Sequence, residues 1–276
     1  AVETQLPALG ERVTTLETTV TNINQMLDQH AARIEILEAD HAADIAELEA
    51  ELESVTSCYL EPYGNCKDAY LGGENLSGKD LMWIDLRNAD LSGADLSYAH
   101  LDYADLTGAN LENATLTNTY LPNADLSSAY LPNASLTGAY LDYADLTGAY
   151  LENATLTAAI LYEADLTAAI LYEANLMDAD LWYADLTRAN LIGVDLTGAY
   201  LIGADLTGAD LYEATLTEAH LYGADLTGAN LENATLTGAY LIGADLTGAY
   251  LIGADLTGAE LYNADLTAAI LYEANL

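Results

Sequence analysis

From Leu71 onward every fifth residue is leucine, at 42 successive positions without an interruption. Two residues before each leucine the sequence nearly always has alanine, as in the pentads A-D-L-T-G at 204–208 and A-Y-L-I-G at 199–203. A period of five matches neither the 3.6-residue period of an α-helix nor the two-residue period of a strand. The pattern therefore predicts a chain that turns a corner every five residues, with leucine and alanine inside and the three intervening residues outside.

These pentads resemble the pentapeptide-repeat family, whose consensus is A-(D/N)-L-x-x. The resemblance covers residues 71–276. It implies a right-handed parallel β-helix in which four pentads make one square coil. We therefore expect a mainly β solenoid of about ten coils, roughly 50 Å tall at the usual spacing between neighbouring strands. One coil cannot bury its own leucines, whereas stacked coils share a continuous core.

Residues 1–57 have a different pattern, because apolar residues alternate three and four positions apart. This heptad spacing predicts a helical coiled coil. β-Branched residues at position a with leucine at d favour a parallel dimer, although Ile23 at d leaves a trimer open. The alternative is a single amphipathic helix that lies on a β-helix. The predicted seam consists of Leu9, Val13, Leu16, Val20, Ile23, Leu27, Ile34 and Leu37.

Residues 58–70 form a linker between these segments, or a cap for the base of the solenoid. Pro62 and Gly64 indicate turns, and the only two cysteines, Cys58 and Cys66, bracket them. This loop predicts a disulfide and hence an oxidising compartment. The chain begins with alanine, as a secreted protein does after signal removal, so we expect a secreted or cell-surface protein. A trimmed chain would look the same.

The composition is strongly acidic, with a formal net charge of −38 and a pI near 4.1. Such a charge excludes the binding of nucleic acid through its phosphates. No stretch reaches the ~18 apolar residues of a transmembrane helix. Solubility, a halophilic or marine setting, divalent-cation binding and DNA mimicry are all compatible with this acidity.

With twenty residues per coil, one outward column of the solenoid consists entirely of aspartate. Short carboxylates there can accept hydrogen bonds from turn N–H groups, which gives the column a structural explanation. Stacked like charges nevertheless repel by roughly 1 kcal/mol per neighbouring pair in water. Oxygen-rich ladders suit calcium, so calcium is a candidate ligand, and no other cofactor is expected. The column is Asp85, Asp105, Asp125, Asp145, Asp165, Asp185, Asp205, Asp225, Asp245 and Asp265.

Bulky apolar residues recur on two further outward faces of the predicted column. A contiguous exposed stripe is typical of an interface, although the β-propensity of Tyr and Ile also explains them on a repeat surface. Leu276 is the last leucine of the five-residue pattern, and no capping segment follows it in the sequence. We expect this end to contact another chain, either end-to-end or head-to-tail in a filament. The main stripe is Ile160, Tyr162, Trp182, Tyr200, Ile202, Tyr222, Tyr240, Ile242 and Tyr262.

The repeats contain no catalytic constellation, and we expect no enzyme. The favoured interpretation is a secreted, non-catalytic structural protein that associates with itself as a filament subunit, surface appendage or adhesin stalk. The resemblance implies an alternative, because some pentapeptide-repeat proteins imitate B-form DNA and bind DNA gyrase. Those relatives carry Phe in the inward column, whereas this chain has no Phe. A second alternative is an extracellular protein that binds calcium, or ice through threonines such as Thr115 and Thr155.

Overall fold

The computed structural model describes residues 21, 24–27, 30–31, 33, 41 and 58–276. The chain divides into two compact units, Ala1–Ser57 and Cys58–Leu276. The described residues of the first unit are helical, and the side chains of Met26 and Leu27 are exposed there. The other predicted seam residues lie outside the described residues, so the coiled coil stays a prediction. They are Leu9, Val13, Leu16, Val20, Ile23, Ile34 and Leu37.

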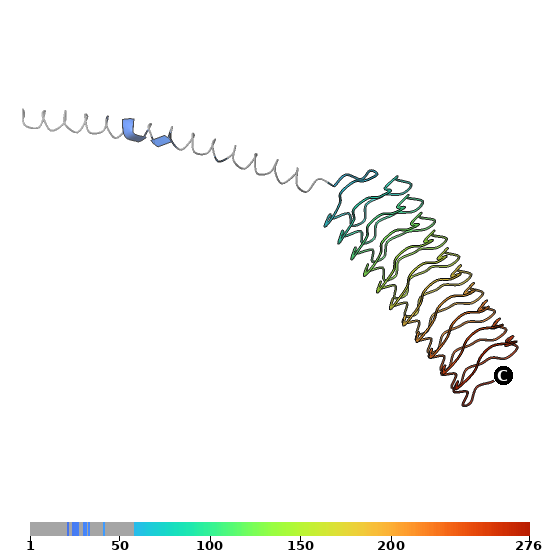
Figure 1. The fold of residues 1–276 in the computed structure, drawn as a ribbon. Helices are drawn as coiled ribbons and strands as arrows, with labels where there is room; N and C mark the ends of the chain where they lie inside the picture. The colour runs from blue at the N-terminus through green and yellow to red at the C-terminus, as the bar shows by residue number, and fades with distance from the viewer. Residues whose placement is uncertain (1–20, 22–23, 28–29, 32, 34–40, 42–57) are drawn as a thin grey trace, which may run out of the picture. The chain divides into compact units, whose positions relative to one another are not determined.

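The second unit is a solenoid of stacked twenty-residue coils (Figure 1). Every fifth residue pairs in parallel with the residue twenty positions later, from Asn65 with Asp85 to Asp255 with Asn275. Each pairing is a single-residue bridge, because the chain turns again directly after it, and residues 58–276 contain no longer strand. Four pentads therefore make one coil with four faces, which confirms the predicted period.

We number the positions of each pentad from its leucine: leucine is position 1, the corner residues are positions 2 and 3, alanine is position 4 and the bridge residue is position 5. The N–H of position 4 donates to the carbonyl of position 1, as from Ala89 to Leu86 at 3.0 Å. Position 3 has a positive φ in every pentad from Tyr63 to Glu273. A positive φ at the third residue of a hydrogen-bonded turn is characteristic of type II turns.

Glycine and asparagine recur at position 3 because they tolerate a left-handed backbone better than other residues. Gly248, for example, has φ +66°, and a Cβ at this residue would meet no atom within 4 Å. We did not predict this requirement from the sequence. Its signal was the frequent recurrence of Gly and Asn two residues after the leucines.

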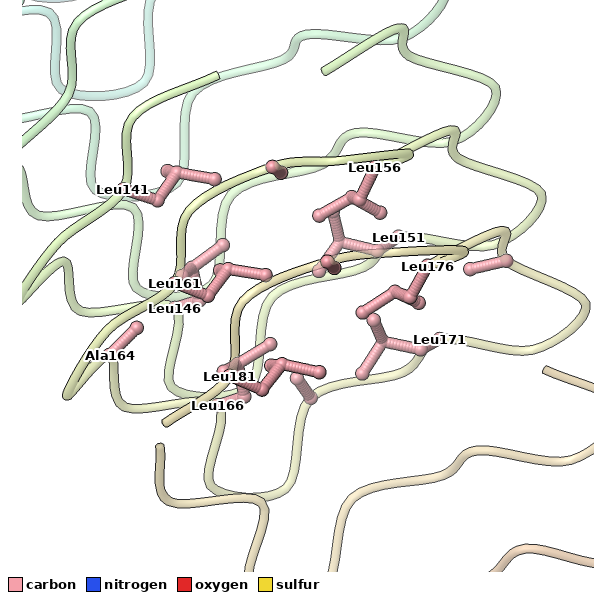
Figure 2. Close-up of a cluster of buried hydrophobic side chains, with 14 of the residues drawn as sticks. Leu141, Leu146, Leu151, Leu156, Leu161, Ala164, Leu166, Leu171, Leu176 and Leu181 are labelled. Atoms are coloured by element: carbon pink, nitrogen blue, oxygen red, sulfur yellow. The ribbon is translucent and has the colours of Figure 1, made fainter. Parts of the chain in front are cut away.

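Leucine and alanine fill the inside of the solenoid, as the five-residue pattern predicts (Figure 2). Every leucine at position 1 from Leu71 to Leu256 is buried. Ile84 and Val194 are buried in the place of alanine. The buried Thr119 takes the same place, and its hydroxyl donates to the carbonyl of Leu96 at 2.7 Å. One continuous apolar core therefore runs through the stacked coils.

Four of the five backbone N–H groups in a pentad have backbone acceptors. Position 4 donates within the turn. Positions 1 and 3 donate to the next coil, as from Leu86 to Asp105 at 2.7 Å and from Asn88 to Thr107 at 3.0 Å. Position 5 donates to the preceding coil, as from Asp105 to Ile84 at 2.9 Å. The N–H of position 2 is the one group that needs a partner from a side chain.

Candidate functional site

Where position 5 is aspartate or asparagine, its side chain supplies that partner. All ten aspartates of the predicted column accept a hydrogen bond from the N–H two residues later, over 2.8–3.2 Å, as from Thr147 to Asp145 at 2.8 Å. Asparagine makes the same bond elsewhere, as at Asn110 and Asn175. The structural explanation of the column is therefore confirmed, because each carboxylate satisfies the remaining N–H of its corner.

Two prolines at position 2 remove the need for this hydrogen bond. Tyr120 and Tyr130 stand at position 5 and have no carboxylate to offer, and the residues at position 2 after them are Pro122 and Pro132. Proline has no N–H that needs an acceptor, and its fixed φ suits the second residue of a type II turn.

The aspartates stack in register, since parallel bridges join Asp85 to Asp105 and continue in the same way to Asp265. Hydrogen bonding favours the charged form at both ends of this column. The side chain of Arg87 lowers the pKa of Asp85, and the side chain of Thr267 lowers the pKa of Asp265. We call this face the aspartate column.

Arg87 shows how the aspartate column holds a guanidinium. Its Nε donates to Oδ1 of Asp85 at 2.9 Å, and its Nη2 donates to Oδ2 of the same carboxylate at 2.6 Å. Its Nε also lies 3.3 Å from Oδ2 of Asp105 in the next coil. One bidentate guanidinium thus spans two successive rungs of the column.

No group of three or more His, Cys, Asp or Glu side chains in the described part of the chain is arranged to hold a metal ion. The calcium ligands suggested by the sequence form one column, with one carboxylate from each coil. Calcium at the aspartate column stays a prediction from the sequence.

Aromatic rings line the corner that precedes the aspartate column in most coils. Tyr63, Trp83 and Tyr103 stack at centroid distances of 6.2 and 4.2 Å, with their planes within 5° of parallel. Further along the solenoid, Tyr162 contacts Tyr143 and Tyr183 edge to face, at 5.5 and 6.2 Å. These corner rings border the aspartate column directly, because Tyr103 and Tyr183 stand two residues before aspartates of the column.

A ladder of His and Tyr at position 5 lies beside this corner. His100, Tyr120 and Tyr140 stack at 4.6 and 4.7 Å, with their planes within 2°. In later coils Tyr200, His220 and Tyr240 stack at 4.8 Å, and Tyr222 at the corner contacts both His220 and Tyr240. We call the corner and the ladder together the aromatic edge. Its rings are Tyr63, Trp83, His100, Tyr103, Tyr120, Tyr140, Tyr143, Tyr162, Trp182, Tyr183, Tyr200, His220, Tyr222, Tyr240 and Tyr262.

The structure places the stripe predicted from the sequence on this same edge. Ile160, Tyr200 and Tyr240 share the ladder column through the bridges of Asp180 and His220. The other predicted residues stand at position 2 of the corner, namely Tyr162, Trp182, Ile202, Tyr222, Ile242 and Tyr262. We had predicted only the later coils. In the earlier coils the rings move from position 2 to position 3, so a search for one repeated position misses them.

A second apolar face lies on the opposite side of the coil. Tyr130 and Tyr150 contact each other there at 6.0 Å, with tilted planes, and Ile170 follows in the same column. The corner after it, which includes Tyr172, leads to a mixed column with Asp95, Thr115, Ser135 and Asn175 rather than to the aspartate column. The two apolar faces therefore differ in the charge beside them.

Other predicted positions lie away from both faces. A disulfide joins Cys58 to Cys66, whose Cα atoms are 4.3 Å apart, and Cys66 contributes to the core. Leu276 is exposed. Among the described residues, no helix is both long enough and apolar enough to cross a membrane.

Known proteins contain the same repeat. The family model "Pentapeptide repeats (8 copies)" matches residues 65–101, 94–131, 121–157, 134–171, 159–198, 174–211, 195–233, 214–251 and 244–276. Curated protein sequences give no match.

Solved structures of pentapeptide-repeat proteins are also similar. HetL, which is involved in heterocyst differentiation regulation in the cyanobacterium Nostoc sp. strain PCC 7120, is 36% identical, over 76% of this chain and 88% of its own, with a TM-score of 0.31. QnrB1, a plasmid-mediated fluoroquinolone resistance protein, is 22% identical, over 69% of this chain and 86% of its own, with a TM-score of 0.34. A protein from the Arabidopsis thaliana thylakoid lumen is 24% identical, over 55% and 70%, with a TM-score of 0.15.

Proposed function

The chain belongs to the pentapeptide-repeat family, and from that membership we propose that it is a non-catalytic structural protein. In this proposal it associates with copies of itself through residues 1–57 and docks partners along its solenoid. Membership implies the right-handed β-helix, a rigid column with the same core in every coil. The Cys58–Cys66 disulfide supports a location in an oxidising compartment outside the cytoplasm.

The observation that carries the proposal is the aromatic edge. Soluble proteins seldom expose contiguous apolar stripes, and aromatic residues are enriched where proteins dock. Tyr63, Tyr143 and Tyr183 are 77%, 50% and 56% exposed along this edge. Because the rings follow one edge through many coils, the edge suits a long docking contact better than a compact substrate pocket.

The first unit supports self-association. Met26 and Leu27 are apolar, helical and exposed in the single chain, and Leu27 is an a position of the predicted heptads. An exposed apolar residue at a heptad seam gains about 1.5–3 kcal/mol when a partner helix buries it.

Sedimentation equilibrium of the full chain tests this self-association. We expect a dimer or a trimer, and we expect Val20→Asp at the seam to give monomers because it would bury an unpaired charge. Thr18→Asp, at the outward f position of the same heptad, is the matched control and should leave the oligomer intact. A wild-type chain that is monomeric at all concentrations would contradict the proposal. Protection of DNA gyrase from quinolones in a supercoiling assay would instead favour DNA mimicry.

A further inference from the structure

The aromatic edge and the aspartate column run side by side along the solenoid, so a partner that docks on one also meets the other. The corner ring stands two or three positions before the carboxylate in most coils, as for Tyr103 with Asp105 and Tyr183 with Asp185. The partner therefore contacts aromatic rings and a row of negative charges at the same time. Both properties restrict its chemistry.

A second copy of this solenoid does not meet the requirement for charge. The Lys and Arg residues of the second unit are Lys67, Lys79, Arg87 and Arg188, and three of these lie before the column has passed its second aspartate. Such a copy would bring its own carboxylates rather than cations to the contact. Because like charges brought together across an interface oppose binding, the partner must supply the positive charge.

The chain itself shows which cation the column holds. In each carboxylate of the first two rungs, Oδ1 accepts the N–H of the corner, and Oδ2 faces the guanidinium of Arg87. The bridges repeat the spacing between Asp85 and Asp105 at every later pair of the column. From Asp125 to Asp265, no ion pair forms within the described part of the chain. These later rungs thus present carboxylates in the arrangement that already binds one arginine.

The rings next to these later rungs favour arginine over lysine. The planar guanidinium both stacks on aromatic faces and binds carboxylates in a bidentate manner, whereas the lysine ammonium is a compact, strongly hydrated charge. Tyr162 meets Tyr143 and Tyr183 edge to face, so these three rings do not cover one another face to face as the stacked rings do. Tyr143 and Tyr183 are about half exposed, so both rings offer surface to a guanidinium beside Asp145 and Asp185.

We infer that the aromatic edge and the aspartate column together bind an arginine-rich segment of a partner protein. The inference rests on the proposed docking function, since it names the partner of the docking edge. Successive guanidinium groups occupy successive pairs of aspartates, as Arg87 occupies the first pair, and their planes contact the neighbouring rings. This contact differs from binding to an acidic surface in general, because it requires the rings as well as the charge.

Fluorescence anisotropy with labelled nona-arginine and nona-lysine tests the inference, using the full chain at physiological salt. The peptides carry equal charge, so attraction to an acidic surface alone gives similar affinities. We expect nona-arginine to bind at least about tenfold more tightly, because it alone combines bidentate pairing with stacking. Equal affinities for the two peptides would overturn the inference.

The rings are tested with the triple variant Tyr143→Ser, Tyr162→Ser, Tyr183→Ser. We expect it to lose about tenfold in affinity for nona-arginine and little for nona-lysine. The matched control makes the same substitutions on the opposite apolar face, at Tyr130, Tyr150 and Tyr172, and should stay within twofold of the wild type. An equal loss in both triple variants would overturn the inference. Circular dichroism melting curves verify that the variants are folded.

The charges are tested with Asp145→Asn, Asp165→Asn and Asp185→Asn together. Asparagine keeps the hydrogen bond to the corner N–H, as Asn110 does, so the coils are retained. We expect weaker binding of nona-arginine and a shallower dependence on salt. Asp95→Asn, Asp195→Asn and Asp255→Asn remove the same charge from the mixed column and serve as the control. Equal losses in both sets would overturn the inference.

Failure of the inference and failure of the proposed self-association give different results. Sedimentation reports the oligomer without any peptide, and anisotropy reports the peptide preference in whatever oligomer is present. A monomeric chain that still prefers arginine at the aromatic edge supports the inference and contradicts only self-association.

Discussion

Position 3 has a left-handed backbone, and a substitution at one glycine there measures the free-energy cost of this conformation for other residues. In Gly248→Ala the new Cβ would meet no atom within 4 Å, so packing contributes nothing to the change. A φ of +66° costs an L-residue about 1–2 kcal/mol relative to glycine. Alanine recovers about 0.4–1 kcal/mol through a less flexible unfolded chain. We therefore expect Gly248→Ala to destabilise the solenoid by about 0.5–1 kcal/mol.

Thermal unfolding followed by circular dichroism measures this difference. For a unit of this size the expected fall in Tm is about 2–4 °C per kcal/mol. Thr247→Ala is the control, because it changes the neighbouring corner residue without a positive φ, and we expect little change. Gly248→Asn should cost less than Gly248→Ala, since asparagine tolerates the left-handed region. The reverse change, Ala168→Gly at φ +55°, should stabilise the fold.

A contrasting site separates backbone strain from a steric clash. In Gly203→Ala the new Cβ would lie 2.7 Å from a ring carbon of Tyr183, so we expect a larger loss than at Gly248. In the background of Tyr183→Ser, where the ring is absent, Gly203→Ala should cost no more than Gly248→Ala does in the wild type. A neutral or stabilising Gly248→Ala would refute the reasoning, because it would mean that the left-handed corner imposes no cost.

Three further predictions concern a corner hydrogen bond, a buried leucine and the pKa of two carboxylates. Asp205→Ala should lower the free energy of unfolding by about 1 kcal/mol, because the N–H of Thr207 loses its acceptor at 2.9 Å. Asp205→Asn should be close to neutral, and urea unfolding compares the two variants. Leu161→Ala should cost about 2–5 kcal/mol in the same assay, since the buried side chain leaves a cavity. Hydrogen bonds from Ser97 and Thr257 lower the pKa values of Asp95 and Asp255 below their usual value of 3.8. The stabilisation that this shift provides is present above the unfolded pKa and is lost as the pH falls through the folded pKa. Asp95→Asn should therefore make Tm less dependent on pH below about 4.

The sequence was sufficient for the repeating part of the fold because each coil is specified locally and then copied. The period of five predicted the corners, and the Leu and Ala pattern predicted which side is inside, as the buried Leu141 and Leu161 show (Figure 2). The hydrogen bond from Thr147 to Asp145 also followed from residue type and spacing. These features need only near neighbours and the coil above.

Two features of the site could not be predicted from the sequence, because they depend on contacts between side chains of different coils. Trp83 stands at position 3 and Trp182 at position 2, so the aromatic edge has no single repeat position, and only the stacking of coils shows that its rings form one edge. The double use of Asp105, with one oxygen on the corner N–H and the other on Arg87 in the preceding coil, likewise needs coordinates.

The uniformity of the aspartate column goes beyond what the fold requires. Position 5 accepts threonine at Thr115, serine at Ser135 and asparagine at Asn175 in the mixed column, and the coils there form with the same bridges. Asparagine would satisfy the corner N–H as well as aspartate does, without the repulsion between stacked charges. Asparagine would, however, place an amide nitrogen where the second carboxylate oxygen stands. An oxygen that accepts a guanidinium is therefore the property that ten aspartates add to the column, and it is the property that Arg87 already uses.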